Sequence, residues 1–367
     1  MTMKHTHSKP GRLLRAVRIF LICVLAVIVI AVTVFLCVFG GALRTLSTYR
    51  RLDDYGMCTL DYRYDYRFDE YLKTGAASPR ETEKLVSKLL LHGIPIDLNL
   101  MGEGCSTFFA QNEKGEYIYG RNFDFGYAPS VVVFTNPDDG YASVGVADVA
   151  FAGYKTKESI PQKDGLSFDN LAMIAAPYLC MDGMNEKGVA FAVMTVPIAE
   201  PPHIEGAPTL NTCTMIRLVL DKAATVDEAI ELMRQYNIFW YGSSTGHFLI
   251  ADASGRSVVV EYHDKTLDVI EVDTDYQVAT NFNLYNDWQM GHGVGRYGTI
   301  EQTLIENDGA LTKEQSLKLL ESVVVPGKAQ WSALYNLTTG EVSVFPHGQS
   351  ESVKDFSLTM THNEQGG

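Results

Sequence analysis

The chain has 367 residues, of which 46% are hydrophobic, 11% aromatic and 20% charged. This composition excludes an intrinsically disordered protein and is sufficient for one large hydrophobic core or two modest ones. The net charge is −14, and the body is more acidic than this figure suggests, because all 44 acidic but only 22 of the 30 basic residues lie beyond residue 51. Such a surface repels phosphate backbones, so no nucleic-acid partner is expected.

The first element is an apolar run from Ile19 to Phe39, in which Thr33 is the only polar residue. At about 1.5 Å per residue this run spans roughly the thickness of the hydrocarbon core of a membrane. Basic residues precede it. The sequence therefore predicts a basic cytoplasmic tail at 1–18, a transmembrane signal anchor at 19–43 and an extracytoplasmic remainder. A cleaved signal peptide is the alternative, although the apolar region of such a peptide is usually about 7–15 residues long.

Residues 44–104 form a compositionally distinct segment. It is rich in Tyr, Asp and Arg up to Tyr71. A helix is predicted after this stretch, because Ser78-Pro-Arg-Glu81 is a capping box with proline at the first helical position and Gly93 is a suitable stop. We expect the whole segment to be an extracellular linker or propeptide, or a retained small subunit.

From Cys105 onward the pattern is one of strands and turns. A hairpin is predicted around Asn112-Glu-Lys-Gly115. Further strand-like runs follow at 131–135, 143–151, 188–196, 247–251, 257–262, 276–280, 331–336 and 341–345. Helical patterns interrupt them at 212–222, 226–235 and 313–323. Because the strands form hairpins rather than regular β-α-β units, the predicted fold class is α+β, as a layered sandwich preceded by one transmembrane helix.

Several patterns with chemical meaning are interpreted as structural. The cysteines and histidines lack C-x-x-C and H-E-x-x-H spacing, so neither a catalytic metal nor a cofactor is expected. The G-x-S-x-G pattern around Ser244 lacks a preceding strand and a following helix. The glycines of 293–298 fit G-x-G-x-x-G but follow no buried strand, and we interpret them as a loop that leads into a helix. Cys180 and Cys213 are interpreted as core thiols, and Asn336-Leu-Thr338 fits a glycosylation sequon by pattern only.

The informative stretch begins at Gly104-Cys105, with Arg121 sixteen and Asp124 nineteen residues after the cysteine. These residues and spacings resemble those of the choloylglycine hydrolase and penicillin V acylase family of N-terminal nucleophile hydrolases, whose mature chain begins with cysteine. The resemblance extends to about residue 346. It includes Asp182-Gly-Met-Asn-Glu-Lys-Gly188, the strand pair in 247–262, Thr280-Asn281, Arg296 and the strand at 330–335.

The resemblance implies a four-layer αββα catalytic domain at 105–367 and a role for each matching residue. An N-terminal cysteine supplies a nucleophile and, through its α-amine, a base. Arg121 would favour the thiolate, and Asp124 would orient the amine. The side chain of Asn281 would donate to the oxyanion, and Arg296 would tune the electrostatics of the site or bind the polar end of the substrate. Thr195 is a weaker candidate for oxyanion or substrate contact, because the family's bile-salt hydrolases carry Asn at that place.

This chemistry requires cleavage before Cys105, because residue 105 of the translated chain has no free amine. We expect self-cleavage, in which the thiol attacks the carbonyl carbon of Gly104 and water hydrolyses the resulting thioester. Gly104 offers no side chain to obstruct that attack. A long segment before the cysteine is similar to the acid ceramidase and isopenicillin-N acyltransferase relatives, which mature by internal cleavage.

The expected function is that of a membrane-anchored extracytoplasmic amidohydrolase that cleaves linear N-acyl amides. Its expected partners are a small-molecule amide and, through the N-terminal helix, a membrane; the sequence predicts no oligomeric state. Alternatives are an acyltransferase that uses the same thioester and a non-catalytic binding module with the same fold. At the residue level, Arg121 and Asp124 are alternatively a buried structural ion pair, Asn281 the cap of a turn and Arg296 a surface residue at a helix start.

Overall fold

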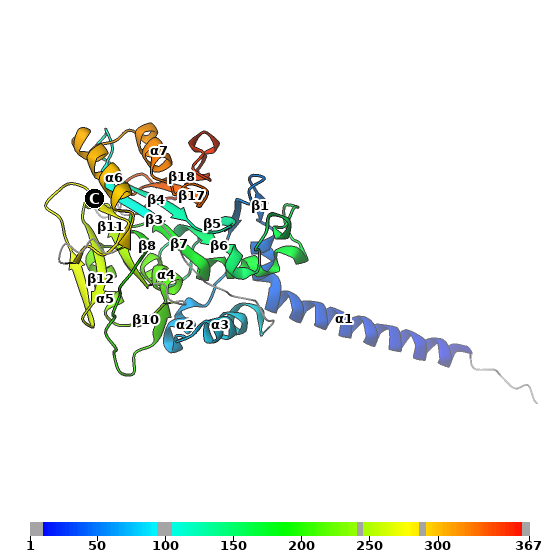
Figure 1. Ribbon diagram of the computed structural model, residues 1–367. Coiled ribbons are helices and arrows are strands. Elements are labelled where there is room, and N and C mark those ends of the chain that lie inside the picture. The colour runs from blue at the N-terminus through cyan, green and yellow to red at the C-terminus, as the bar shows by residue number, and fades with distance from the viewer. Residues whose placement is uncertain (1–9, 94–104, 241–244, 286–290, 362–367) are drawn as a thin grey trace, which may run out of the picture.

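The computed structural model describes residues 10–93, 105–240, 245–285 and 291–361, and two β-sheets facing each other form its centre (Figure 1). The larger sheet has nine strands. In sheet order these are β1 (Arg50–Arg51), β2 (Cys58–Asp61), β5 (Ser130–Thr135), β6 (Ser143–Asp148), β7 (Cys180–Asn185), β8 (Ala190–Val196), β11 (Thr245–Ala251), β12 (Ser257–His263) and β13 (Thr266–Ile270).

The smaller sheet has six strands, and all of its pairs are antiparallel. In order these are β14 (Gln277–Ala279), β3 (Cys105–Gln111), β4 (Tyr117–Asp124), β17 (Ala329–Asn336), β18 (Glu341–Pro346) and β19 (Lys354–Ser357). Two short ladders stand apart, β9 (Thr209–Asn211) with β10 (Asn237–Phe239) and β15 (Asn281–Phe282) with β16 (Gly291–His292).

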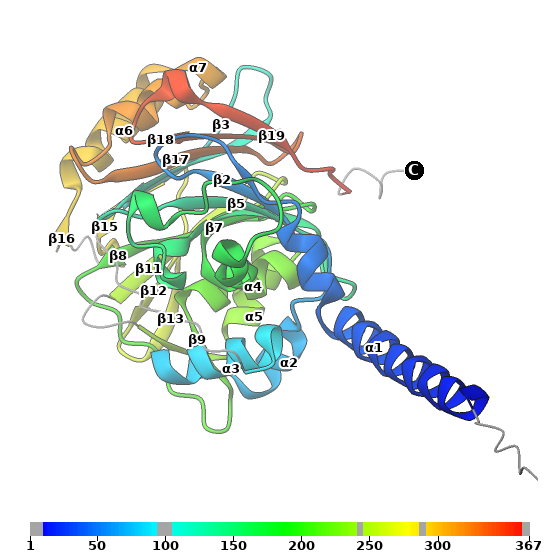
Figure 2. The same cartoon turned by 90° about the vertical axis from the view of Figure 1, so that its right-hand side faces the viewer.

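Helices cover the outer faces of both sheets (Figure 2). α6 (Val294–Glu306) and α7 (Lys313–Ser322) lie on the six-stranded sheet. α4 (Thr212–Lys222) and α5 (Val226–Met233) lie on the nine-stranded sheet, with α2 (Phe68–Thr74) and α3 (Pro79–Leu91) beyond them. The 3-10 helices are η1 (Val149–Ala152), η2 (Lys157–Ser159), η3 (Phe168–Leu179) and η5 (Ser350–Ser352). The result is a layered α+β fold with the sheets inside.

Strand alternation divides β3 between two hydrophobic cores. Phe108 points to the core beneath α6 and α7, where it joins Leu320. Cys105 and Phe109 belong to the core between the two sheets. Because side chains alternate along a strand, the same period of two that fills both cores also turns Cys105 toward the nine-stranded sheet.

The segment before Cys105 belongs to the same core. β2 pairs with β5 in parallel, with Leu60 opposite Val133, and so extends the nine-stranded sheet. Leu60, Tyr66 and Tyr71 are buried in the core that also holds Cys105. Residues 44–93 therefore pack into the same core as the residues from Cys105 onward.

The N-terminal helix α1 (Pro10–Leu46) has two different halves. By length and composition its part from Leu14 to Leu46 could cross a membrane, although a signal sequence near an N-terminus would pass the same test. Its apolar side chains up to Val38 are exposed, whereas Thr45 and Leu46 are buried in the body. Thr45 Oγ1 accepts the N–H of Arg63 at 2.8 Å. The helix is thus joined to the body by its last turn.

Most elements with a local sequence signal are confirmed. The Ser78 hydroxyl accepts the N–H of Glu81 at the start of α3, and the hairpin of β3 and β4 encloses the predicted turn. Several elements were not predicted, among them β7 inside the stretch interpreted as a turn, the 3-10 helix η3, and the short strands β1 and β2. Gly104 and Ser244, two residues singled out in the sequence, lie outside the described residues.

Candidate active site

Strand register brings distant parts of the chain together around Cys105. Cys105 is the first residue of β3, pairs with Phe123 of β4 and is 2% exposed. On the other side of β3, Thr107 lies opposite Ala279 of β14. Two residues further along this antiparallel register, the chain places Asn281 level with Cys105. The site is therefore built at the edge where the first residue of β3 meets the segment that follows β14.

Polar side chains hold the main chain of Cys105 on both sides. Its N–H donates to Asn281 Oδ1 at 2.6 Å. Arg296 Nη1 donates to its carbonyl oxygen at 2.8 Å, and Arg296 Nη2 donates to Asn281 Oδ1 at 2.6 Å. Asn281 and Arg296 therefore bind each other as well as the cysteine, which fixes the main-chain nitrogen of residue 105 in one position.

The carboxamide of Asn281 is oriented differently from the sequence-based expectation. Its Nδ2 donates to the carbonyl oxygen and to the hydroxyl oxygen of Thr195, both at 2.9 Å, rather than toward an open position. The reason is that the groups on the opposite side, Cys105 N–H and the Arg296 guanidinium, are donors, so the carbonyl oxygen of the amide must face them. Thr195, expected as a weaker site residue, thus accepts both hydrogen bonds of the Asn281 amide nitrogen.

Arg121 is fully buried beside the thiol and forms an ion pair with a residue of the other sheet. It lies two residues before Phe123 on β4 and hence on the same face. Its Nε is 3.6 Å from Asp182 Oδ2 on β7. Asp182 also accepts a hydrogen bond from Trp331 Nε1 at 3.1 Å and another from the Tyr335 hydroxyl. Among the described residues, the ion-pair partner of Arg121 is therefore Asp182 and not Asp124.

Asp124 pairs instead with the arginine that comes late in the sequence. Its Oδ2 lies 3.2 Å from Arg296 Nη1, and its Oδ1 accepts the N–H of Val325 at 3.1 Å. Burial raises the pKa of Asp124 to about 6, although the Val325 N–H, Arg296 and Arg121 all act to lower it. Asp124 is thus linked to the main chain of Cys105 through Arg296, which donates to the Cys105 carbonyl oxygen.

The thiol of Cys105 is held in its protonated form in this structure. Burial raises its pKa above the ordinary value, and the nearby positive charges of Arg121 and Arg296 only partly oppose this rise. Asp124 raises the pKa further. Arg121 acts in the expected direction, since it lowers the pKa of the thiol, but burial outweighs it in this structure.

The glycines of 293–298 place Arg296 rather than bind a nucleotide. Gly293 caps α6 with a φ of 96°, and a Cβ there would lie 2.9 Å from Arg296 Nη2 and 3.0 Å from Thr280 Oγ1. Only glycine allows this close approach without strain. The helix then begins at Val294, so Arg296 lies in its first turn and points back to β3. The predicted helix is confirmed, but it begins already at Val294, so all of the stretch 293–298 except its first residue belongs to the helix rather than to a loop.

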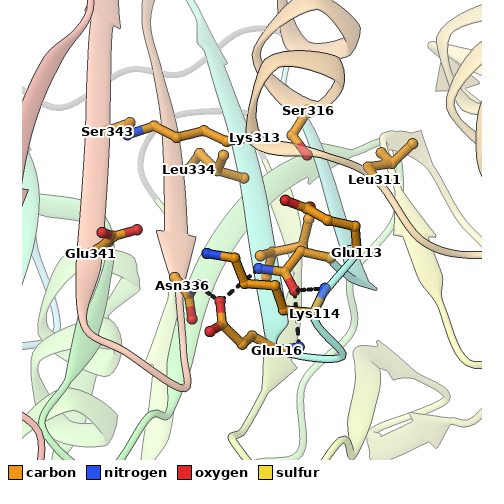
Figure 3. A pocket seen from close by; sticks show the side chains of 12 residues that line it. Glu113, Lys114, Glu116, Leu311, Lys313, Ser316, Leu334, Asn336, Glu341 and Ser343 are labelled. Carbon is orange, nitrogen blue, oxygen red and sulfur yellow. Dashed lines mark hydrogen bonds between the residues drawn. The ribbon is translucent and has the colours of Figure 1, made fainter.

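A small pocket on another part of the surface is not the site (Figure 3). It has a volume of about 100 Å³ and lies between the β3–β4 turn and α7. Its wall contains Asn336 of the predicted sequon, which is 7% exposed and donates to Glu116 Oε2 at 2.8 Å. The sequon asparagine is therefore engaged in the fold. Among the described residues, no group of three His, Cys, Asp or Glu side chains is arranged to hold a metal.

One residue of the site was overlooked in the sequence. Asp182 was quoted only as the start of a turn motif, and its carboxylate turns out to be the buried partner of Arg121. β7 follows directly on the 3-10 helix η3 and all of its residues are buried, so the sequence has no hydrophobic alternation that would reveal a strand there.

Comparisons with known proteins identify a family and several relatives. A family model described as linear amide C–N hydrolases, choloylglycine hydrolase family, matches residues 105–319. A penicillin V acylase from Pectobacterium atrosepticum is 34% identical over 111 residues, which are 27% of this chain and 29% of that protein. A bile salt hydrolase/transferase from Clostridium perfringens is 26% identical over 202 residues, 51% of this chain and 56% of that protein.

The same comparison holds for the fold. This chain is similar to the crystal structure of a variant of the conjugated bile acid hydrolase from Clostridium perfringens, with a TM-score of 0.50 and 18% sequence identity. The matched region covers 69% of this chain and 92% of the hydrolase chain. The match to the curated relatives spans only about 29% to 56% of their length. The fold is thus shared over most of that hydrolase, while the sequence match is partial.

Proposed function

Since the chain belongs to the choloylglycine hydrolase family of linear amide C–N hydrolases, we propose that it is an amidohydrolase that cleaves linear N-acyl amides through Cys105 after cleavage of the Gly104–Cys105 bond. The observation that carries this proposal is the hold on the main chain of Cys105. Asn281 and Arg296 bind the nitrogen and the carbonyl oxygen of this one residue. A main-chain nitrogen held in one position by side chains is oriented for reaction, as is needed if it becomes the α-amine of the mature site.

The first step is the maturation of the chain. The Cys105 thiol adds to the carbonyl carbon of Gly104, the C–N bond breaks, and the proton of the thiol goes to the nitrogen that is released as the α-amine. The thioester between Gly104 and the sulfur is then hydrolysed by water, which releases the Gly104 carboxylate and restores the thiol. The hydrogen bond from Cys105 N–H to Asn281 keeps the nitrogen in place while its bond to Gly104 breaks.

The mature site repeats the same chemistry on a substrate amide. The α-amine takes the thiol proton, the sulfur attacks the acyl carbon, and the proton passes to the leaving amine. Water then hydrolyses the acyl thioester. The developing oxyanion needs an N–H donor, and we assign it to the Asn281 N–H that now rests on the Thr195 hydroxyl, because the other N–H remains satisfied by the Thr195 carbonyl.

We further infer that residues 10–93 stay bound after cleavage as a small subunit. β2 is hydrogen-bonded to β5, and the hydroxyls of Tyr62 and Tyr178 join the two fragments through the carbonyl oxygens of Ile174 and Tyr66. These side chains are buried. If α1 spans a membrane with the body outside, the catalytic fragment is thereby kept at the membrane without a covalent link to the anchor.

The test is made on the full chain expressed in membranes. We expect intact-mass measurement and N-terminal sequencing to find a fragment that begins at Cys105, together with the N-terminal fragment after gentle purification. Incubation with a set of N-acyl amino acids and N-acyl amines should release free acid from at least one of them. A chain that remains uncleaved, and that releases no acid, would instead be the non-catalytic binding module.

A transferase is the second candidate, favoured by the name of one relative, a bile salt hydrolase/transferase. The same acyl thioester would then pass to an amine instead of water. Adding a second amine to the reaction separates the two functions, because a transferase forms the new amide at the expense of the free acid.

A further inference from the structure

We propose that His247 and Glu261 are a positioning pair for this site, with His247 held as an imidazolium whose second N–H fixes the peptide next to Asn281. The pair lies in the second sheet, behind the residues described above. In its kinetic consequence the proposal rests on the proposed function, whereas the protonation state of the pair does not.

Both ring nitrogens of His247 face acceptors. His247 is fully buried on β11. Its Nδ1 is 2.8 Å from Glu261 Oε1, and its Nε2 is 2.8 Å from the carbonyl oxygen of Thr280. A carbonyl oxygen can only accept, so Nε2 carries a proton. A carboxylate also only accepts, so Nδ1 carries a proton as well, and the ring that satisfies both contacts is positively charged.

The surroundings of Glu261 hold its carboxylate in the ionised form. Glu261 Oε1 accepts the N–H of Leu284 at 2.8 Å, and Oε2 accepts the N–H of Tyr285 at 3.2 Å and Asn283 Nδ2 at 3.3 Å. Burial acts to raise the pKa of Glu261, but the bonds to His247 and to these donors outweigh it and lower the pKa. The pair therefore ties β11 and β12 to the segment that carries Asn281 on both of its sides.

The position of this pair gives it a function that stability alone does not explain. A buried ion pair contributes little to stability compared with an apolar replacement of the same volume, so its presence in a core invites another reason. Here the imidazolium holds the carbonyl of Thr280, and the next residue presents its carboxamide oxygen to Cys105 N–H at 2.6 Å. A displacement of about 1 Å at a reacting group can cost about 10²-fold in rate.

The first experiment measures the cleavage of the Gly104–Cys105 bond in the full chain synthesised in the presence of lipid. His247→Phe should slow the cleavage per folded molecule by about 10²-fold. Glu261→Gln should slow it by only about 10-fold, since a neutral histidine can still donate from Nε2 to Thr280. Asp221→Asn is the matched control, because it weakens a buried ion pair on α4 and should leave the cleavage rate per folded molecule unchanged.

The second experiment reads the protonation state directly. Solid-state NMR of the ¹⁵N-histidine-labelled full chain in lipid should find both nitrogens of His247 protonated at neutral pH, and only one in the Glu261→Gln variant. A neutral ring in the wild-type chain would overturn the proposal, as would an unimpaired cleavage rate in His247→Phe. A wild-type chain that shows no cleavage at all would overturn the proposed function instead, and the NMR result would still decide the state of the pair.

Discussion

Two buried clusters in this molecule contain the same three residue types. In the first, Cys105 begins strand β3 and lies beside Arg121, which is paired with Asp182. In the second, Cys180 begins strand β7 and lies beside Arg217, which is paired with Asp221. Both arginines are 0% exposed. A buried thiol beside an arginine and an aspartate is therefore not in itself an active site.

The two clusters differ in what surrounds the cysteine main chain. The main chain of Cys180 lies in the ladder of β6 and β7, opposite Ala147. Its thiol donates to the carbonyl oxygen of Ala176 at 3.6 Å and contacts Arg217. Arg217 itself is bound by a short ion pair of 2.6 Å and by Ser143 Oγ at 2.6 Å. The polar side chains of the second cluster thus bind one another and Ser143.

Around Cys105 the polar groups converge on the main-chain nitrogen and oxygen. Asn281 and Arg296 bind them directly, and Asp124 holds Arg296. The ion pair between Arg121 and Asp182 is longer than that between Arg217 and Asp221, at 3.6 Å against 2.6 Å. The positive charge of Arg121 is therefore less strongly neutralised by its aspartate. The candidate nucleophile is therefore distinguished by the side chains that bind its main-chain nitrogen and oxygen, and not by the arginine beside its sulfur.

The largest expected effect comes from removing the first of the two thiols. Cys105→Ala should abolish both the cleavage of the Gly104–Cys105 bond and the release of acid from amides, because no other group can form the thioester. Intact-mass measurement of the full chain should find one uncleaved species. A Cys105→Ala chain that still yields the shorter fragment would show that another protease makes the cut, and would contradict the distinction drawn between the clusters.

The next test replaces the two arginines in the same way. Arg121→Met should reduce the cleavage rate by about 10²–10³-fold, as expected for the loss of one preorganised charge at a reacting centre. Arg217→Met should leave the cleavage rate per folded molecule unchanged and lower the free energy of unfolding by about 3–5 kcal/mol, because Asp221 loses its buried ion-pair partner. Denaturant unfolding and cleavage rate per folded molecule separate the two effects.

The arginine test has its own control. Arg121→Lys and Arg217→Lys keep a positive charge and are used if either methionine variant fails to fold. Equal cleavage rates in the two position-matched variants would mean that the clusters do not differ in function.

A third test uses Asp124, a second carboxyl group that lies in the Cys105 cluster and pairs with Arg296. Its pKa of about 6 lies above the ordinary value of an aspartate because of burial. Ionised Asp124 is the form that pairs with Arg296, so the cleavage rate of the newly synthesised chain should rise as the pH increases through about 6. Asp124→Asn should remove this dependence and lower the rate at neutral pH by about 10–10²-fold.

The sign for stability is the opposite. A carboxyl group whose pKa is raised by folding binds its proton more tightly in the folded chain, so its contribution to stability is present below its ordinary pKa and is lost as the pH rises through about 6. Ionising Asp124 therefore costs stability while it favours cleavage. Wild-type and Asp124→Asn chains with the same pH dependence of cleavage would contradict this assignment.

The sequence allowed the local elements to be predicted because their signals are local. Signals within a few residues mark the Ser78 cap of α3, the capping box of α7 and the turn between β3 and β4, and each is found where it was expected. At α3 the second half of the predicted box differs, because Glu81 accepts the N–H of Ala77. Strands β1 and β2 were missed because what makes them strands is their pairing, directly or through β2, with β5, some seventy residues away.

The sequence indicated the residues that surround Cys105 with the exception of Asp182, but it did not indicate how they pair. Family motifs indicated Arg121, Asp124 and Arg296. Which carboxylate pairs with which arginine depends on how the two sheets stack, since Asp182 reaches Arg121 from the nine-stranded sheet. The side on which the Asn281 amide presents its oxygen is likewise decided by Arg296, fifteen residues later and on a helix. No spacing rule contains these contacts, because they arise from packing between layers.

The smallest expected effect is that of removing the second thiol. Cys180→Ala deletes one buried sulfur, and a cavity of that size costs about 1 kcal/mol of unfolding free energy. Burial raises the pKa of the Cys180 thiol to about 12, so it stays protonated and inert at neutral pH despite Arg217. The cleavage rate and the release of acid should therefore equal those of the wild-type chain. Thiol labelling of the folded protein checks this, because an unreactive Cys180 should gain no label until the chain is unfolded. A Cys180→Ala variant that cleaves more slowly than the wild-type chain would show that the second cluster takes part in the chemistry.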